Sequence, residues 1–167
     1  MKHSDRFFKG KPKLNSKSKY NQGFFTPTNP EKYSGNLESL IYRSGLELKW
    51  FKYFDVHPSI IQWKCEEVVI YYHNPVDNRM HKYFIDVWIK YKDKQDKIHE
   101  CLIEIKPFQQ VQPPKKNNRK TKSYCYAVNN YIVNESKWNA AKKIAVERGA
   151  DFKILTETGF VEWNITK

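Results

Sequence analysis

The sequence predicts an α/β fold with a mixed β-sheet, in which an antiparallel meander is joined by one parallel strand and flanked by helices. A stretch with helical spacing comes first, and three strand-like stretches separated by turn residues follow it at 67–72, 80–91 and 98–106. A second helical region then precedes a last strand at 151–156, so the chain can return to the sheet in parallel orientation.

The first thirty residues differ in composition from the rest of the chain. Residues 1–30 are rich in Lys, Asn, Ser, Gly and Pro and show little hydrophobic periodicity, so they cannot bury enough apolar surface to fold alone. We therefore expect a flexible basic arm at 1–30 and one folded domain at 31–167. The cations of the arm suit phosphates or an acidic partner surface, and a solvated tail with no task is the alternative.

Helical periodicity begins after the arm. Residues 37–54 place apolar side chains three and four positions apart, which predicts an amphipathic helix capped by Ser34 or Asn36. Pro58 disfavours helical geometry in the residue before it and ends this helix. Glu47 lies within it.

The strands are separated by turn chemistry at 74–78 and 93–97, and prolines keep the basic segment 113–120 out of regular structure. The helical spacing between 124 and 145 fits either two helices, with Asn134 as the N-cap of the second, or one kinked helix. Gly149 is the expected C-terminal stop.

Charge points to a polyanionic partner. The 167 residues, enough for one domain with its own core, contain 30 Lys and Arg against 18 Asp and Glu, which gives a net charge of +12. Nucleic acid is the first candidate, and a merely soluble basic protein is the alternative. Because no basic amphipathic helix with a continuous apolar face and no run of membrane-spanning length occurs, we expect no membrane partner.

Cysteine usage bears on the compartment. Cys65, Cys101 and Cys125 are odd in number and lack paired spacing, which argues against a disulfide framework and against a zinc site of the Cys-x-x-Cys kind. We expect a cytosolic, reduced protein.

The run Leu-Ile-Glu-Ile-Lys at 102–106 carries the most specific chemistry. Glu104 and Lys106 are two positions apart and share one strand face, while Asp86 lies in the apolar run of the preceding strand. Antiparallel pairing would bring Asp86 and Glu104 to neighbouring positions, provided that both face the same side. Two carboxylates are enough to hold a magnesium ion, which predicts a metal-assisted phosphodiesterase site.

Two further side chains complete this hypothesis. Lys106 would orient the attacking water or steady the charge on the phosphate, and Glu47 would complete the metal shell or hold a metal-bound water. Each residue alone has a simpler interpretation: a cross-strand ion pair for Glu104 and Lys106, a solvated helix carboxylate for Glu47, and a strand-end aspartate for Asp86.

Side chains near this motif or on the basic segment are expected to contact the DNA backbone without reading its sequence. They are Arg43, Gln109, Gln112, Lys115, Lys116, Arg119 and Lys120. A solvated charge run is the alternative interpretation of the last four. Tyr71, Tyr72 and Trp88 are assigned to core packing instead of base stacking.

The order Glu47, Asp86, then Glu104, Ile105 and Lys106 resembles the PD-(D/E)xK nuclease superfamily, in which a helix glutamate precedes an acid on one strand and an acid-x-lysine on the next. One departure is that Ile85, in place of proline, precedes Asp86. The resemblance implies a restriction-endonuclease-like core.

A closer resemblance covers most of the chain after the arm. The stretches 41–48, 83–86, 103–107, 134–141 and 152–157 resemble the head-completion nucleases of T-even-like tailed bacteriophages, which are themselves similar to the end-cleaving subunit of a bacterial transposase. This resemblance implies a DNA endonuclease or exonuclease that uses Mg²⁺, with Mn²⁺ as the alternative ion. The implied reaction follows genome packaging, when filled heads are prepared for joining to tails.

The same resemblance implies roles for individual residues and partners. Glu47, Asp86, Glu104 and Ile105 would bind the metal, and Lys106 would be the catalytic base or phosphate partner. DNA would be the substrate, with portal or neck proteins as further partners, in the cytoplasm of the infected host and at the head–neck region of the virion. Two alternatives stay open: a structural head or neck protein that does not need catalysis, and a transposase-type endonuclease subunit.

Overall fold

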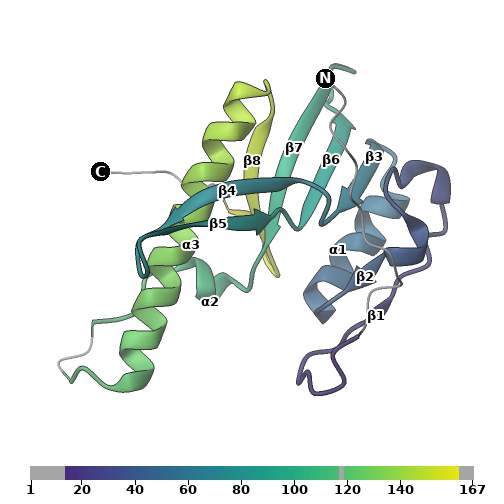
Figure 1. Cartoon of the computed structure of the whole chain (residues 1–167). Helices are drawn as coiled ribbons and strands as arrows, with labels where there is room; N and C mark the ends of the chain where they lie inside the picture. The colour runs from purple at the N-terminus through teal and green to yellow at the C-terminus, as the bar shows by residue number, and fades with distance from the viewer. Residues whose placement is uncertain (1–13, 117–118, 162–167) are drawn as a thin grey trace.

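The computed structural model describes residues 14–116 and 119–161, with no side chains described for residues 160–161. Its centre is a five-stranded sheet with the strand order β3-β6-β7-β8-β9 (Figure 1). The strands are β3 (Ile60–Cys65), β6 (Val87–Lys92), β7 (Ile98–Ile105), β8 (Asp151–Thr156) and β9 (Gly159–Val161).

The expected mixed sheet is confirmed. β3, β6 and β7 form an antiparallel meander, and β8 joins β7 in parallel after a helical connection. β9 then pairs antiparallel with β8, which the sequence patterns did not predict.

The strands of the meander differ from the prediction. The stretch 80–91, predicted as one strand, divides into β5 (Arg79–Phe84) and β6, and β5 pairs with β4 (Val69–Asn74) in a separate two-stranded sheet. β3, which the prediction missed, takes the place expected for 67–72.

Two backbone hydrogen bonds mark the points where the β4–β5 hairpin leaves the central sheet and returns to it. Ile85 N–H donates to the carbonyl of Val68 at 2.9 Å, and Glu66 N–H donates to the carbonyl of Asp86 at 3.2 Å. Glu66 has a φ of 52°, a left-handed conformation that turns the chain sharply out of β3. These contacts place Asp86 at the point where the chain leaves the hairpin and enters β6.

The first helix is shorter than expected. α1 (Gly45–Val56) begins after Ser44, whose hydroxyl accepts a hydrogen bond from Glu47 N–H at 3.1 Å, so neither Ser34 nor Asn36 caps it. Two 3₁₀ turns and a short two-stranded sheet precede it along the chain. These elements are β1 (Gly23–Phe24), η1 (Pro30–Lys32), η2 (Leu37–Ser39) and β2 (Ile41–Tyr42).

The long helix near the C-terminus is continuous. α3 (Lys122–Glu147) begins at Thr121, whose hydroxyl accepts from Tyr124 N–H at 3.2 Å, and Asn134 lies in its interior, so the predicted cap at Asn134 is wrong. The expected stop is confirmed, because Gly149 follows the helix with a φ of 67°. A short helix, α2 (Phe108–Val111), leads from β7 toward it.

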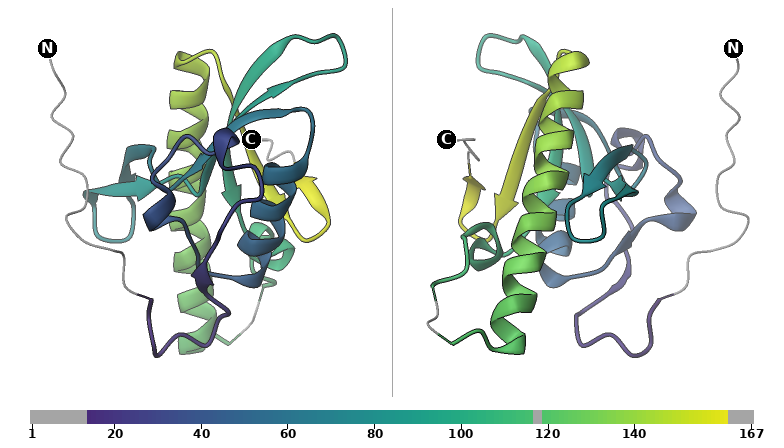
Figure 2. Two further views of the ribbon diagram at one scale, coloured as in Figure 1. Left: turned by 90° about the vertical axis from the view of Figure 1, so that its right-hand side faces the viewer. Right: turned by 60° about the vertical axis from the view of Figure 1, so that its left-hand side comes forward.

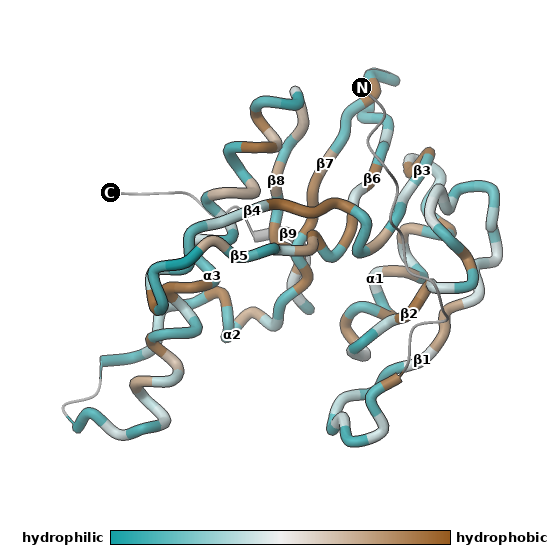
Figure 3. Tube along the Cα trace, in the orientation of Figure 1, coloured by the Kyte–Doolittle hydropathy of each residue, from teal (hydrophilic) through white to brown (hydrophobic). Residues whose placement is uncertain are grey.

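Helices cover opposite faces of the central sheet (Figure 2). α1 packs Phe51 and Phe54 into a core that includes Ile103, whereas α3 packs Ala141 into a core that includes Leu102. Successive residues of β7 therefore point to opposite faces, each covered by helix, as expected for a strand buried on both sides. Figure 3 shows this hydrophobic centre along β7 and the hydrophilic segment between α2 and α3.

Part of the expected arm is packed on the domain. The carboxylate of Asp55, which is 1% exposed, accepts hydrogen bonds from Thr28 N–H at 2.7 Å and Asn29 N–H at 3.0 Å. Phe25 packs against the core beside α1. Packed structure therefore begins before residue 31, and residues 1–13 of the expected arm lie outside the described residues.

All three cysteines are free thiols, two of them buried. None of the helices in the described part of the chain is long and apolar enough to span a membrane.

Candidate active site

Asp86 and Glu104 lie opposite each other at one end of the β6–β7 pair. Val87 pairs with Ile103, so the preceding residue, Asp86, lies across from Glu104. Oδ2 of Asp86 accepts a hydrogen bond from Ile105 N–H at 2.7 Å, which fixes the carboxylate beside β7. The register on which the predicted site depends is therefore present.

Glu104 is held from two sides. It is only 2% exposed, its Oε1 lies 3.0 Å from Nζ of Lys106, and its Oε2 accepts a hydrogen bond of 2.5 Å from the hydroxyl of Tyr83. A buried carboxylate needs such partners, because burying an unpaired charge is costly. Glu104, Lys106 and Tyr83 thus form one connected polar group.

Like charges and burial shape the electrostatics of this group. Burial and the negative charge of Glu104 raise the pKa of Asp86 well above its ordinary value. Burial alone would lower the pKa of Lys106, but the charges of Glu104 and Asp86 outweigh that effect and raise it. Lys106 is therefore a cation at neutral pH, and the two carboxylates repel each other.

Glu47 lies in the first turn of α1, as expected, and its carboxylate is held by local contacts. Its Oε2 accepts from Arg43 N–H at 2.8 Å and its Oε1 from the Ser44 hydroxyl at 3.0 Å, so the residues just before α1 hold its carboxylate at the start of the helix. Burial raises its pKa, and its charge contributes to the pKa of Asp86 and Lys106. Glu47 is thus close enough to act on the site through its charge.

The carboxylates are not gathered into a three-acid cluster. Among residues 14–116 and 119–161, no group of three or more His, Cys, Asp or Glu side chains is arranged to hold a metal ion. The structure therefore brings Asp86, Glu104 and Lys106 together and leaves Glu47 in its capping contacts.

The residues expected to contact DNA have different surroundings. Arg43 forms two contacts with Glu66, at 2.7 and 3.0 Å, so its guanidinium is already paired. Gln109 is exposed on α2, three residues beyond Lys106, and Gln112 follows the end of that helix. The cations Lys115, Lys116, Arg119 and Lys120 are exposed between α2 and α3, on either side of the two residues that are not described.

Two residues beside the site were not predicted. Tyr83 reaches Glu104 from the hairpin, and Nζ of Lys137 on α3 lies 5.6 Å from the ring centre of Tyr83 and 5.7 Å from that of Tyr72. Burial and the positive charge of Lys106 lower the pKa of Lys137, which places this second cation near the first.

A sequence signal for Lys137 existed. On a helix it shares a face with Val133, Ala141 and Ile144. All three belong to or pack against the core between α3, the β4–β5 hairpin and the central sheet. A single lysine in an otherwise apolar face of a helix is unusual, and it indicates that the ammonium group interacts with a polar or charged partner.

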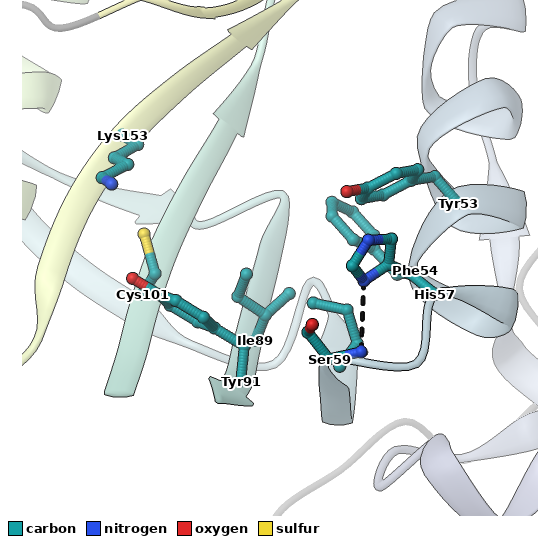
Figure 4. A pocket seen from close by; sticks show the side chains of 9 residues that line it. Tyr53, Phe54, His57, Ser59, Ile89, Tyr91, Cys101 and Lys153 are labelled. Carbon is teal, nitrogen blue, oxygen red and sulfur yellow. Dashed lines mark hydrogen bonds between the residues drawn. The ribbon is translucent and has the colours of Figure 1, made fainter. Parts of the chain in front are cut away.

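A pocket elsewhere on the sheet holds none of these residues (Figure 4). It lies between the end of α1 and the sheet, and its walls include Phe54, His57, Tyr91 and Cys101. Tyr91 is five positions from Asp86 along the chain, about 16 Å at strand spacing, so this pocket is separate from the carboxylate pair.

Comparison with known proteins agrees with the geometry. The family described as TnsA-like endonuclease N terminal matches residues 57–157, a region that contains Asp86, Glu104 and Lys106. The head completion nuclease of Enterobacteria phage T4 is 38% identical over 141 residues, which cover 82% of this chain and 91% of that protein. No solved structure matches. The chain therefore belongs to the TnsA-like endonuclease family, whose fold is restriction-endonuclease-like, and is a relative of the T4 head completion nuclease.

Proposed function

We propose that this chain is a divalent-metal-dependent deoxyribonuclease that hydrolyses phosphodiester bonds in the DNA of a tailed phage. One observation carries the proposal: two carboxylates, Asp86 and Glu104, lie opposite each other with Lys106 paired to one of them. The family match supports nuclease chemistry, and the site supplies the residues that such chemistry needs.

The donor set fits Mg²⁺, with Mn²⁺ as the alternative. Magnesium prefers oxygen ligands, keeps several waters and needs only one or two carboxylates, which Asp86 and Glu104 supply. Burial and the charge of Glu104 raise the pKa of Asp86, and a divalent cation bound between the two carboxylates would offset the repulsion between them. Ile105 can contribute only its carbonyl oxygen, and Glu47 would act from α1 through a metal-bound water.

A bound Mg²⁺ would stabilise negative charge on the phosphate and lower the pKa of a bound water. The side chains provide the remaining hydrogen bonds. Lys106, as an ammonium, donates hydrogen bonds to the attacking water or to a phosphate oxygen, and Tyr83 holds Glu104 in place. Burial strengthens these interactions, because the effective dielectric constant near them is lower than in water.

Charge supports DNA as the substrate. The net charge of +12 favours a polyanion, and the exposed cations between α2 and α3 follow closely after the β7 strand that carries Glu104. Contacts from such cations bind phosphates without reading sequence.

Cleavage assays test the proposal with a matched control. Asp86→Asn and Glu104→Gln should abolish cleavage of plasmid and linear DNA in Mg²⁺ or Mn²⁺. Glu100→Gln is the control, because Glu100 lies on the same strand and accepts a hydrogen bond from Trp88 Nε1–H at 3.0 Å, away from Asp86. Wild-type protein that is inactive with every divalent ion, or Asp86→Asn protein that is fully active, would refute the proposal.

We also propose that the reaction occurs on packaged DNA during head completion and head–tail joining. The name of the T4 relative supports this role, which implies portal or neck proteins as partners and a place in the infected cell and at the head–neck region. Complementation of a phage lacking its own gene for this protein separates catalysis from structure. Infectious particles restored by wild-type but not by Asp86→Asn protein would support a catalytic role, whereas restoration by both would favour a purely structural head protein.

A further inference from the structure

Among the residues that the structure describes, Lys137 is the cation beside the carboxylate pair for which no paired carboxylate is found. Glu104 is paired with Lys106, and Asp86 accepts from Ile105 N–H. Across residues 14–116 and 119–161, the contacts found for the Lys137 ammonium are the ring faces of Tyr72 and Tyr83, at 5.7 and 5.6 Å. Its hydrogen-bond donors are therefore left for another acceptor.

The two rings restrict where this ammonium lies. Tyr72 and Tyr83 are each 5% exposed, and their ring centres lie 6.4 Å apart at an angle of 84°. The electrostatic attraction of a cation to aromatic faces orients it but does not replace hydrogen bonds to its N–H groups. Tyr83 is also fixed through Glu104, so the position of Lys137 is coupled to the site.

The charge balance of the site indicates the kind of acceptor. The carboxyl groups of Asp86 and Glu104 act electrostatically on two lysines, Lys106 and Lys137. A divalent cation held by the carboxylates would leave a local excess of positive charge, which suits an anionic ligand. A phosphodiester group offers unprotonated oxygens that accept from an ammonium.

We propose that Lys137 binds a backbone phosphate of the DNA strand at the cleavage site, held in position by Tyr72 and Tyr83. This inference rests on the proposed nuclease function and adds a substrate contact from α3. Lys106 then interacts with the reacting phosphate and the attacking water, and Lys137 binds the backbone of the same DNA strand.

DNA binding without cleavage tests this contact. A fluorescent duplex is titrated with protein carrying Glu104→Gln, which prevents turnover, over a series of salt concentrations. Adding Lys137→Met should weaken binding at low salt about fivefold or more and lower the slope of log affinity against log salt by about 0.9, the share of one phosphate contact. Lys137→Arg should keep the slope.

Matched variants separate this effect from general charge loss and from misfolding. Lys143→Met removes an exposed cation from another face of α3 and should leave affinity and slope unchanged. Lys137→Gln is a second neutral variant, and it should lower the slope as Lys137→Met does. If both neutral variants keep the wild-type slope and affinity, the inference is wrong.

The two proposals fail in different ways. An unchanged slope in the neutral Lys137 variants contradicts the phosphate contact, even where wild-type protein cleaves DNA. Wild-type protein that cuts no DNA contradicts the nuclease function, even where the neutral variants lose the contact.

Discussion

The hydroxyl of Tyr83 donates a hydrogen bond of 2.5 Å to Oε2 of Glu104, which joins the β4–β5 hairpin to the central sheet. This contact links two sheets that share no strand pairing, and it does so at the carboxylate beside Lys106. The position of the predicted metal ligand therefore depends on how the hairpin packs.

Tyr83→Phe removes this hydrogen bond and keeps the ring. Because a hydrogen bond to a charged group contributes about 1.5–3 kcal/mol to folding, we expect the free energy of unfolding to fall by about that amount. We also expect cleavage by the folded protein to fall about tenfold or more, because Glu104 loses the contact that positions it. Initial rates at saturating Mg²⁺ measure the effect. Tyr71→Phe, which alters an exposed tyrosine on the same hairpin, should cleave at the wild-type rate. Equal losses in both variants would contradict a specific role for Tyr83.

The cations between α2 and α3 should contribute to DNA affinity through charge alone. Replacing Lys115 and Lys116 by Ala should weaken binding to all sequences equally and lower the salt slope by about two, near 0.9 for each phosphate contact. Filter binding or anisotropy over a salt series measures this. The control is Lys94→Ala with Lys97→Ala, two exposed cations in the β6–β7 turn at the other end of the sheet (Figure 1). Equal slopes for both double variants would contradict a localised DNA contact.

Asp55 should hold the N-terminal segment on the domain. Asp55→Ala leaves Thr28 and Asn29 N–H groups without their acceptor, and we expect the free energy of unfolding to fall by about 2–4 kcal/mol. Urea denaturation gives this value, and proteolysis should become faster near residue 28. Asp151→Ala, at an exposed position in β8, should change stability by less than about 0.5 kcal/mol.

Thiol reactivity should separate the three cysteines. Burial raises the pKa of Cys65 and of Cys101 to about 12, whereas Cys125 is exposed on α3. At pH 8 a thiol with a pKa near 12 is about one part in 10⁴ thiolate, so one equivalent should react in the folded protein and three after denaturation. Rapid reaction of all three in the native state would contradict the packing around Cys65 and Cys101.

The same shifts fix the sign of a pH effect. Unfolding returns the buried thiols to an ordinary pKa near 8.5, so above that pH the unfolded state loses protons that the folded state keeps. The contribution of these thiols to stability is therefore lost as pH rises from about 8.5 toward 12.

Sequence patterns predicted the class of fold but not the division of its strands. Tyr83, Ile85, Val87 and Ile89 alternate without interruption and read as one strand. In the structure, Tyr83 and Ile85 pack on the α3 side, whereas Val87 and Ile89 pack on the α1 side. At Ile85 and Asp86 the chain passes from β5 to β6, and the apolar side chains change from the α3 side to the α1 side of the central sheet. The alternation of the apolar residues along the sequence continues unchanged, so it gave no indication of this change.

The predicted start of the first helix was wrong for a related reason. Leu40 and Ile41 are buried and fit helical spacing with the residues after them, but they belong to a turn and to β2. The cap at Ser44, followed by Glu47 three positions later, was the local signal for the true start of α1.

The site could be predicted only where strand pairing determines it. Asp86, Glu104 and Lys106 follow from the register of two neighbouring strands, and they lie together. Tyr83 and Lys137 approach from the hairpin and from α3, through packing between elements that the sequence pattern does not specify. The roles of Glu47 and of the DNA-contacting residues stay predictions.

Metal binding by the carboxylate pair is the central claim, and a melting experiment tests it most directly. The unfolding temperature of metal-free protein is measured as Mn²⁺ or Mg²⁺ is added, for wild type, Asp86→Asn, Glu104→Gln and the Glu100→Gln control. Binding to the folded state alone stabilises it by about 2.7 kcal/mol at one hundred times the dissociation constant. We predict that the unfolding temperature rises with metal for wild type and Glu100→Gln and stays constant for Asp86→Asn and Glu104→Gln. An equal rise in all four proteins would contradict a metal site between Asp86 and Glu104.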